Sequence, residues 1–177
     1  MVRAPQARLL AEVTPPQFKH VFDEARAAGL HSVPHAGETT GPETVWSALT
    51  DLGAERIGHG TSSVQDPELL AHLAEKKIPL EVCPTSNIAT RAVERLEDHP
   101  IRQMYDAGVV VTVNSDDPPM FGTTLNREYE IAADLLGLDE AGVAALARNA
   151  VRASFLDGEG KARIEREIDD YLASWGS

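Results

Sequence analysis

Helical and strand-like patterns of apolar residues alternate along the chain. Residues 15–28 predict an amphipathic helix, because two prolines open the segment, its apolar side chains fall on one stripe and a glycine follows it. Short apolar runs between such helices predict buried strands. In chain order, the predicted elements are helix 15–28, strand 30–34, helix 42–52, strand 55–58, helix 67–77, strand 78–82, helix 99–107 and strand 109–113.

This alternation predicts an α/β fold, because strands separated by helices pair in parallel through right-handed crossovers. The residues that close the first three strands, His35, His59 and Cys83, are separated by equal intervals of sequence, as one strand-helix unit per step requires. Four such strands are half of an eight-stranded barrel, which usually needs about 250 residues. We therefore predict a partial (β/α)8 TIM-type barrel with about four parallel strands and surrounding helices, followed by a helical segment over 125–177.

Nothing in the composition divides the chain into parts. No linker, low-complexity tract or boundary signal interrupts it, and 177 residues are enough to bury a hydrophobic core. We expect residues 1–177 to form a single domain in which residues 1–13 are irregular.

The charge balance argues against some partners. The chain has 28 acidic and 16 basic side chains and a net charge of −12, so it lacks the basic face that nucleic acid requires. No apolar run approaches the roughly 20 residues needed to cross a bilayer, and the start of the chain lacks a secretory segment. We expect a cytoplasmic protein that binds neither nucleic acid nor membrane.

The single cysteine, Cys83, limits the metal chemistry that is possible. It excludes an internal disulfide and any zinc site built from several cysteines. The ligands of any metal must therefore be His, Asp or Glu, and we expect Cys83 to pack as a small apolar residue.

Polar residues gather where the predicted strands end. Parallel strands all open on the same face at their carboxyl ends, so these segments should converge on one pocket. They are His35-Ala36-Gly37-Glu38, His59-Gly60-Thr61, Cys83-Pro84-Thr85-Ser86-Asn87 and Asn114-Ser115-Asp116-Asp117-Pro118.

Each candidate residue has a structural alternative. An imidazole such as that of His35 is an ordinary zinc ligand, but a lone histidine at a strand end is more often a core or surface residue. Glu38 can carry protons to and from a substrate in the same cavity, or it can cap the next helix. His59 can hold or polarise a metal-bound water, or bond to a carbonyl. Asp116 and Asp117 repel each other unless a cation compensates, or they form a surface turn.

The motifs, taken together, resemble a known family. His-Ala-Gly-Glu at 35–38, Arg-Ile-Gly-His-Gly at 56–60, Glu-Val-Cys-Pro-Thr-Ser-Asn at 81–87 and Ser-Asp-Asp-Pro at 115–118 are similar, in order and spacing, to those of the adenosine deaminase family of zinc-dependent hydrolases. The resemblance implies the carboxyl-terminal half of a (β/α)8 barrel enzyme that converts adenosine or deoxyadenosine to inosine or deoxyinosine and releases ammonia.

The resemblance also implies a role for each candidate residue. His35 and Asp116 become ligands of one Zn²⁺ ion, and Glu38 becomes the proton donor to the purine ring nitrogen. His59 becomes the group that orients the attacking water and helps to deprotonate it, and Asp117 becomes a contact to the purine. Zinc suits this chemistry because it lowers the pKa of a bound water toward about 7.

The chain departs from the family's pattern in two respects. The family's His-x-His strand, which supplies two further zinc ligands, has no counterpart in this sequence. The chain also lacks the family's glycine that contacts the purine. One alternative is therefore a truncated and inactive barrel fragment or association module, which self-associates or pairs with a missing amino-terminal half. A relative acting on adenine rather than on a purine nucleoside is the other alternative.

Overall fold

Four short strands form one parallel sheet in the order β1-β2-β3-β4. The computed structural model describes residues 15–175, so residues 1–13, which we expected to be irregular, lie outside the described residues. In the register, His35 pairs with Gly58, Ile57 with Leu80, and Leu80 with Val111. The predicted α/β class and parallel sheet are confirmed. The strands are β1 (His35–Ala36), β2 (Ile57–His59), β3 (Leu80–Val82) and β4 (Val111–Val113).

The first strand lies later in the sequence than predicted. Residues 30–34 have no regular secondary structure, and β1 begins after Pro34. Proline has no backbone N–H, so it can only accept in the ladder, and its carbonyl accepts from the Gly58 amide at 2.9 Å. The Ser32 carbonyl likewise accepts from the Glu55 amide at 2.9 Å. The segment therefore lies beside the sheet without forming its strand.

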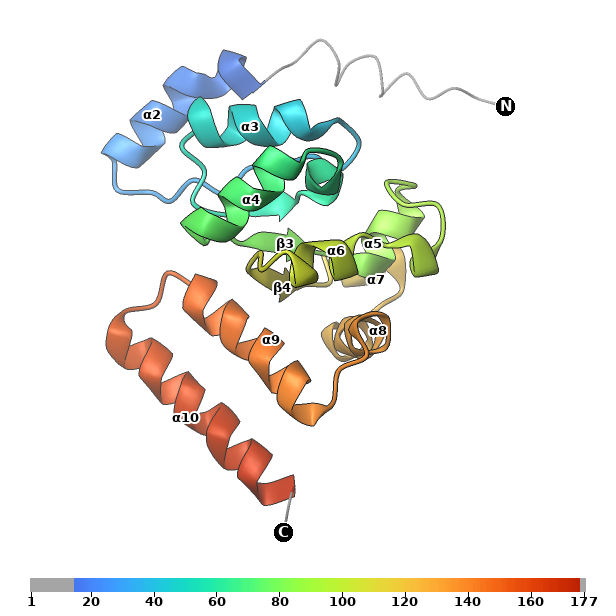
Figure 1. The fold of residues 1–177 in the computed structure, drawn as a ribbon. Helices are drawn as coiled ribbons and strands as arrows, with labels where there is room; N and C mark the ends of the chain where they lie inside the picture. The colour runs from blue at the N-terminus through green and yellow to red at the C-terminus, as the bar shows by residue number, and fades with distance from the viewer. Residues whose placement is uncertain (1–14, 176–177) are drawn as a thin grey trace.

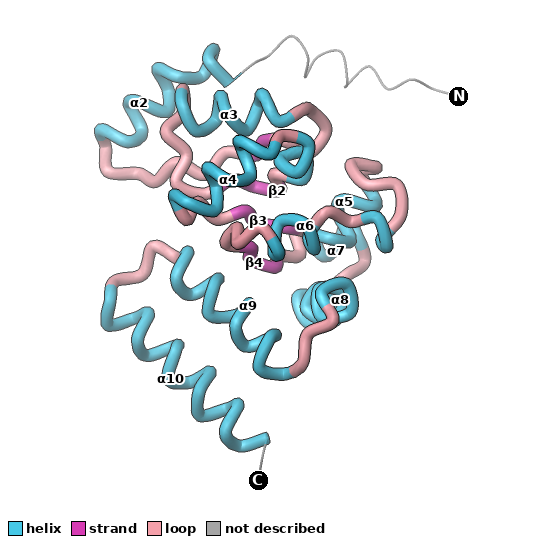
Figure 2. The backbone as a smooth tube through the Cα atoms, in the orientation of Figure 1, coloured by secondary structure: helices cyan, strands magenta, loops and turns pink. Residues whose placement is uncertain are grey.

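Helices connect the strands and continue beyond the last one (Figures 1 and 2). Each predicted helix has a counterpart, and the predicted helical segment after residue 125 contains α8, α9 and α10, whereas the short α5, α7, η2 and η3 were not predicted. The α-helices are α2 (Lys19–Ala27), α3 (Pro42–Thr50), α4 (Pro67–Lys76), α5 (Pro84–Ala89), α6 (Ile101–Asp106), α7 (Pro118–Phe121), α8 (Leu125–Leu136), α9 (Glu140–Ala153) and α10 (Gly158–Trp175). The 3₁₀ turns are η1 (Pro15–Phe18), η2 (Thr61–Gln65) and η3 (Leu96–Asp98).

Side-chain caps define where several helices begin. Asp66 accepts hydrogen bonds from the Glu68 and Leu69 amides at the start of α4, and Asp139 accepts from the Gly142 amide at the start of α9. Such caps satisfy amide groups that have no partner within the helix. The helix starts are thus encoded locally, in agreement with the sequence pattern.

One hydrophobic core joins the strands to the helices. Ile57, Leu80 and Val111, from β2, β3 and β4, are fully buried against Leu69 and Leu73 of α4. Burying a leucine or isoleucine side chain contributes about 1.5–3 kcal/mol. Helix α9 packs on β4, and α10 packs on α9 (Figure 1).

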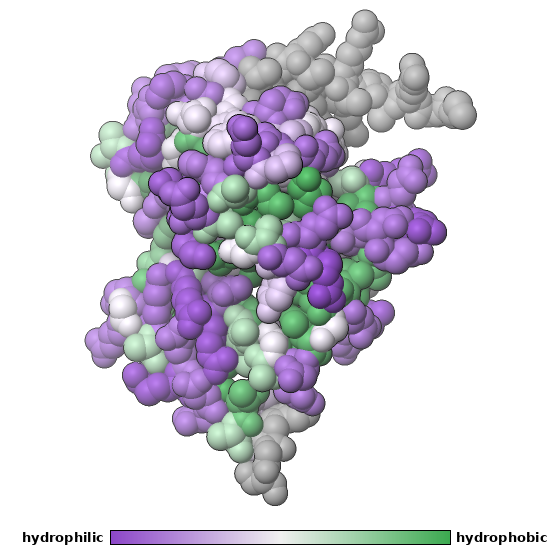
Figure 3. All heavy atoms as spheres, viewed as in Figure 1, coloured by the Kyte–Doolittle hydropathy of each residue, from purple (hydrophilic) through white to green (hydrophobic). Residues whose placement is uncertain are grey.

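The described residues form part of a barrel. β1 and β4 are the two ends of the sheet, and no further strand pairs with either within residues 15–175. Figure 3 shows hydrophobic side chains at the surface between polar helix surfaces, near the level of the sheet. None of the described helices is both long enough and apolar enough to span a membrane.

Candidate active site

Two site residues have unusual backbone conformations. His59, the last residue of β2, has a φ of 65°, and Asp116, which follows β4, has a φ of 55°. Residues other than glycine rarely adopt this left-handed region, at a cost of about 1–3 kcal/mol each. The two strands therefore turn sharply at these residues, which places both side chains at the carboxyl edge of the sheet.

A cavity of about 340 Å³ lies at this edge. It is lined by His35, Gly58, His59, Glu81, Cys83, Asn114, Ser115, Asp116 and Leu125. The expectation that polar strand ends converge is confirmed for His35, His59 and Asp116. The His35 and His59 rings lie edge to face with their centroids 4.9 Å apart.

His59 lies between two carboxylates. Its Nε2 is 3.6 Å from Oε2 of Glu38 and 3.9 Å from Oδ2 of Asp116. The side chain is only 2% exposed. Burial lowers the pKa of His59; the Glu38 and Asp116 carboxylates raise it, but burial prevails. His59 is thus neutral near pH 7.

Glu38 lies on the loop that follows β1, and it approaches His59 without lining this cavity. Its carboxylate accepts a hydrogen bond from the Thr90 hydroxyl at 2.9 Å. The residue at the start of α3 is Gly41, and no side chain caps that helix. The helix-cap alternative for Glu38 is therefore wrong, and its carboxylate is directed toward His59.

The two adjacent aspartates have different surroundings. Asp116 accepts a hydrogen bond from the Ser86 hydroxyl at 2.7 Å and lines the cavity. Asp117 is exposed, does not line the cavity, and caps α7 by accepting from the Met120 amide at 2.9 Å. The surface-turn alternative thus describes Asp117, whose contact with a purine stays a prediction.

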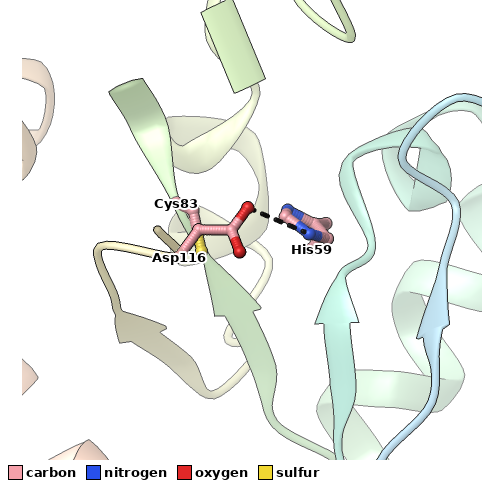
Figure 4. A group of neighbouring side chains, drawn as sticks. All are labelled: His59, Cys83 and Asp116. Atoms are coloured by element: carbon pink, nitrogen blue, oxygen red, sulfur yellow. Dashed lines mark ion pairs between the residues drawn. The ribbon is translucent and has the colours of Figure 1, made fainter. Parts of the chain in front are cut away.

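Cys83 lies closer to the site than its apolar character suggested. Potential ligand atoms of His59, Cys83 and Asp116 all lie within 4.8 Å of one another (Figure 4). Burial raises the pKa of the Cys83 thiol to about 12, and the nearby Asp116 carboxylate adds to this effect. Zinc binds the thiolate form, so binding through Cys83 would require this thiol to lose its proton as the ion binds. The equal spacing of the strand ends was the signal that it would lie near the cavity.

His35 and Asp116 fit part of a zinc site. His35 and Asp116 offer an imidazole and a carboxylate to the same cavity, and both are ordinary zinc ligands. Zinc sites in proteins usually have three or four protein ligands. The described residues thus account for part of such a site.

Two further residues support His59 and were not identified from the sequence. The Asn87 side-chain amide lies 3.1 Å from Nδ1 of His59, and its oxygen lies 3.2 Å from Nε2 of His99. Both are buried, and burial lowers the pKa of His99 to about 4. No predicted strand ends at His99, and its contact with Asn87 depends on how α5 packs against the turn before α6.

Comparison with known proteins identifies the family. The family model described as adenosine deaminase matches residues 10–171. An aminodeoxyfutalosine deaminase of Streptomyces avermitilis is 75% identical over 160 residues, which are 90% of this chain and 45% of that protein.

Solved structures show the same arrangement. The crystal structure of an adenine deaminase from Arthrobacter aurescens is 36% identical with a TM-score of 0.86, covering 90% of this chain and 49% of that one. An amidohydrolase from Burkholderia ambifaria with bound zinc is 28% identical with a TM-score of 0.78, covering 91% and 47%. The chain thus spans about half the length of the proteins it matches. With the family model matching most of its length, the chain belongs to the adenosine deaminase family.

Proposed function

We propose that this chain contributes to the zinc-dependent hydrolytic deamination of a 6-aminopurine nucleoside. The observation that carries the proposal is the approach of the Glu38 and Asp116 carboxylates to one nitrogen of His59 at the cavity. This arrangement brings together an acid, a hydrogen-bonding imidazole and a metal-binding carboxylate. Water adds to the ring carbon that bears the amine, the carbon–nitrogen bond breaks, and ammonia leaves.

Each residue has a distinct role in this proposal. His35 and Asp116 would hold zinc, which lowers the pKa of a water when bound. Glu38 gives a proton to the purine ring nitrogen, which makes the neighbouring carbon more electrophilic. His59 orients the attacking water, and Asp117 contacts the purine.

The identity to a named relative favours one substrate. At 75% identity, the Streptomyces avermitilis protein supports aminodeoxyfutalosine as the first substrate to test. Adenosine and adenine follow, since the family and a solved relative carry those names, and deoxyadenosine is included beside adenosine as its close analogue. A second cavity of about 470 Å³ adjoins Glu38 and includes Thr39, Gln65 and Arg91. Its polar lining favours a substrate that extends beyond the purine, and hence a nucleoside over free adenine.

Ammonia release from the four compounds, measured with zinc content, tests the proposal. Glu38→Gln should lower kcat by about 10²–10⁴-fold, the usual contribution of a general acid. Glu43→Gln is the matched control, because Glu43 is exposed on α3 and makes the same change of charge. Equal rates in the two variants would contradict the role of Glu38.

A second candidate function is an association module without activity of its own. Two observations favour it. The chain spans only about half the length of each relative. It also offers two candidate zinc ligands, His35 and Asp116, where zinc sites usually have three or four. We propose that a second copy or a separate segment pairs with the edge of β1, which has no strand partner within residues 15–175, and completes the barrel. Light scattering tests self-association: a 19 kDa monomer at all concentrations would contradict it. Ammonia release by such a monomer would favour the enzyme.

A further inference from the structure

We propose that Asn87 and His99 are positioning residues that hold His59 in the tautomer protonated on Nε2, so that His59 presents an N–H donor to the cavity. The proposal deepens the proposed function and rests on it only for its effect on the reaction rate. It is carried by a continuous chain of hydrogen bonds from a backbone amide to the cavity.

The series of hydrogen bonds begins at a backbone amide, which can only be a donor. The backbone amide of Ile101 lies 3.1 Å from Nδ1 of His99, and an amide N–H can only donate. Nδ1 of His99 is therefore an acceptor. His99 is 4% exposed, and burial disfavours its charged form. A neutral His99 that accepts at Nδ1 must carry its proton on Nε2.

Asn87 transmits this direction to His59. The N–H at Nε2 of His99 requires an acceptor, which is the Asn87 side-chain oxygen at 3.2 Å. The amide NH₂ of Asn87 must then face Nδ1 of His59 at 3.1 Å. The reversed amide would place donor against donor at His99. The side chain is fully buried, so water cannot relieve such a clash.

The last step sets what His59 offers to the cavity. Nδ1 of His59 accepts from Asn87 and therefore carries no proton, so the proton of the ring lies on Nε2. That nitrogen faces the Glu38 and Asp116 carboxylates, which both favour an N–H at this position. His59 can thus donate to a carboxylate or to a water between them. It is not free to bind a metal through Nε2, so within the group of His59, Cys83 and Asp116 it acts as a donor.

Nitrogen NMR of the 177-residue chain labelled with ¹⁵N-histidine tests the proposal directly. Two-bond ¹H–¹⁵N correlations distinguish an imidazole protonated on Nδ1 from one protonated on Nε2. We expect both His59 and His99 to be protonated on Nε2 near pH 7, with chelator present. Protonation of His59 on Nδ1 in the unmodified chain would overturn the proposal, whether or not any variant folds.

Asn87→Asp tests whether the amide sets the tautomer. The substitution replaces the NH₂ donor with an acceptor of the same shape, so His59 should gain a proton on Nδ1. Gln103→Glu is the matched control, because Gln103 is exposed on α6 and undergoes the same amide-to-acid change. Its His59 signals should equal those of the unmodified chain. A folded Asn87→Asp chain with unchanged His59 signals would also overturn the proposal.

Kinetics separate the proposal from the proposed function. With a substrate that is turned over, Asn87→Asp should lower kcat by about 10²-fold with KM nearly unchanged, as expected when one oriented donor is lost. Gln103→Glu should keep the full rate. If no substrate is deaminated, the proposed function fails while the tautomers still decide the positioning role. An active, folded Asn87→Asp chain with an unchanged kcat would contradict the role of Asn87 in the reaction.

Discussion

Replacing Gly58 by alanine should displace His35 while leaving the fold intact. Gly58 on β2 pairs with His35 on β1. A Cβ atom at position 58 would lie 2.4 Å from Cδ2 of His35 and 3.0 Å from its Nε2. Ordinary contacts begin at about 3.4 Å, so the imidazole must move by about 1 Å. The cavity therefore loses the position of one candidate zinc ligand.

The expected effect on stability is small. Gly58 does not have a left-handed φ, so alanine can adopt its backbone conformation. Alanine for glycine at such a position stabilises by about 0.4–1 kcal/mol through the unfolded chain, and His35 lies at an exposed edge where its ring can shift. We expect the free energy of unfolding to change by less than about 1 kcal/mol, whereas zinc affinity should fall by about 10–100-fold.

Competition with a chromophoric chelator measures zinc affinity, and urea unfolding measures stability on the same preparation. Gly158→Ala is the matched control, because nothing lies within 4 Å of a Cβ at Gly158. Equal zinc affinities for Gly58→Ala and Gly158→Ala would refute the reasoning. A loss of several kcal/mol in the free energy of unfolding of Gly58→Ala would also refute it, because the contact between position 58 and His35 would then be needed for folding.

Two further predictions concern buried polar groups. Glu128→Ala should lower the free energy of unfolding by about 1–3 kcal/mol, because its buried carboxylate accepts from the Thr85 amide at 3.0 Å and from the Thr123 hydroxyl; urea unfolding measures the loss, and an unchanged midpoint would contradict it. Lowering the pH from 7 to 5 should lower the free energy of unfolding by about 2 kcal/mol. The reason is that burial holds the pKa of His99 at about 4 in the folded chain, against 6.5 in the unfolded chain. The unfolded chain takes up this proton first, so stability falls as the pH falls below 6.5, and a persistent slope in His99→Gln would exclude this cause.

Local patterns in the sequence were enough to predict the sheet and part of the site. The alternation of apolar strands and amphipathic helices predicts parallel pairing, and parallel strands share one carboxyl edge. We could therefore expect His35, His59 and Asp116 to lie near one another, because each comes at or shortly after the end of a predicted strand. The helix caps, such as Asp66, are also encoded locally, because the capping side chain and the amides it binds are neighbours in the sequence.

Only the tertiary structure decided which residues support the site. Asn87 lies in α5, a short helix that the sequence presented as a polar loop, and His99 lies in a different turn. Their contacts with each other and with His59 depend on how separate elements pack, which no local periodicity encodes. Packing likewise places the thiol of Cys83 beside Asp116 and leaves Asp117 at the surface. Hydrophobic alternation thus set the sheet, whereas long-range packing selected the hydrogen bonds that direct its chemistry.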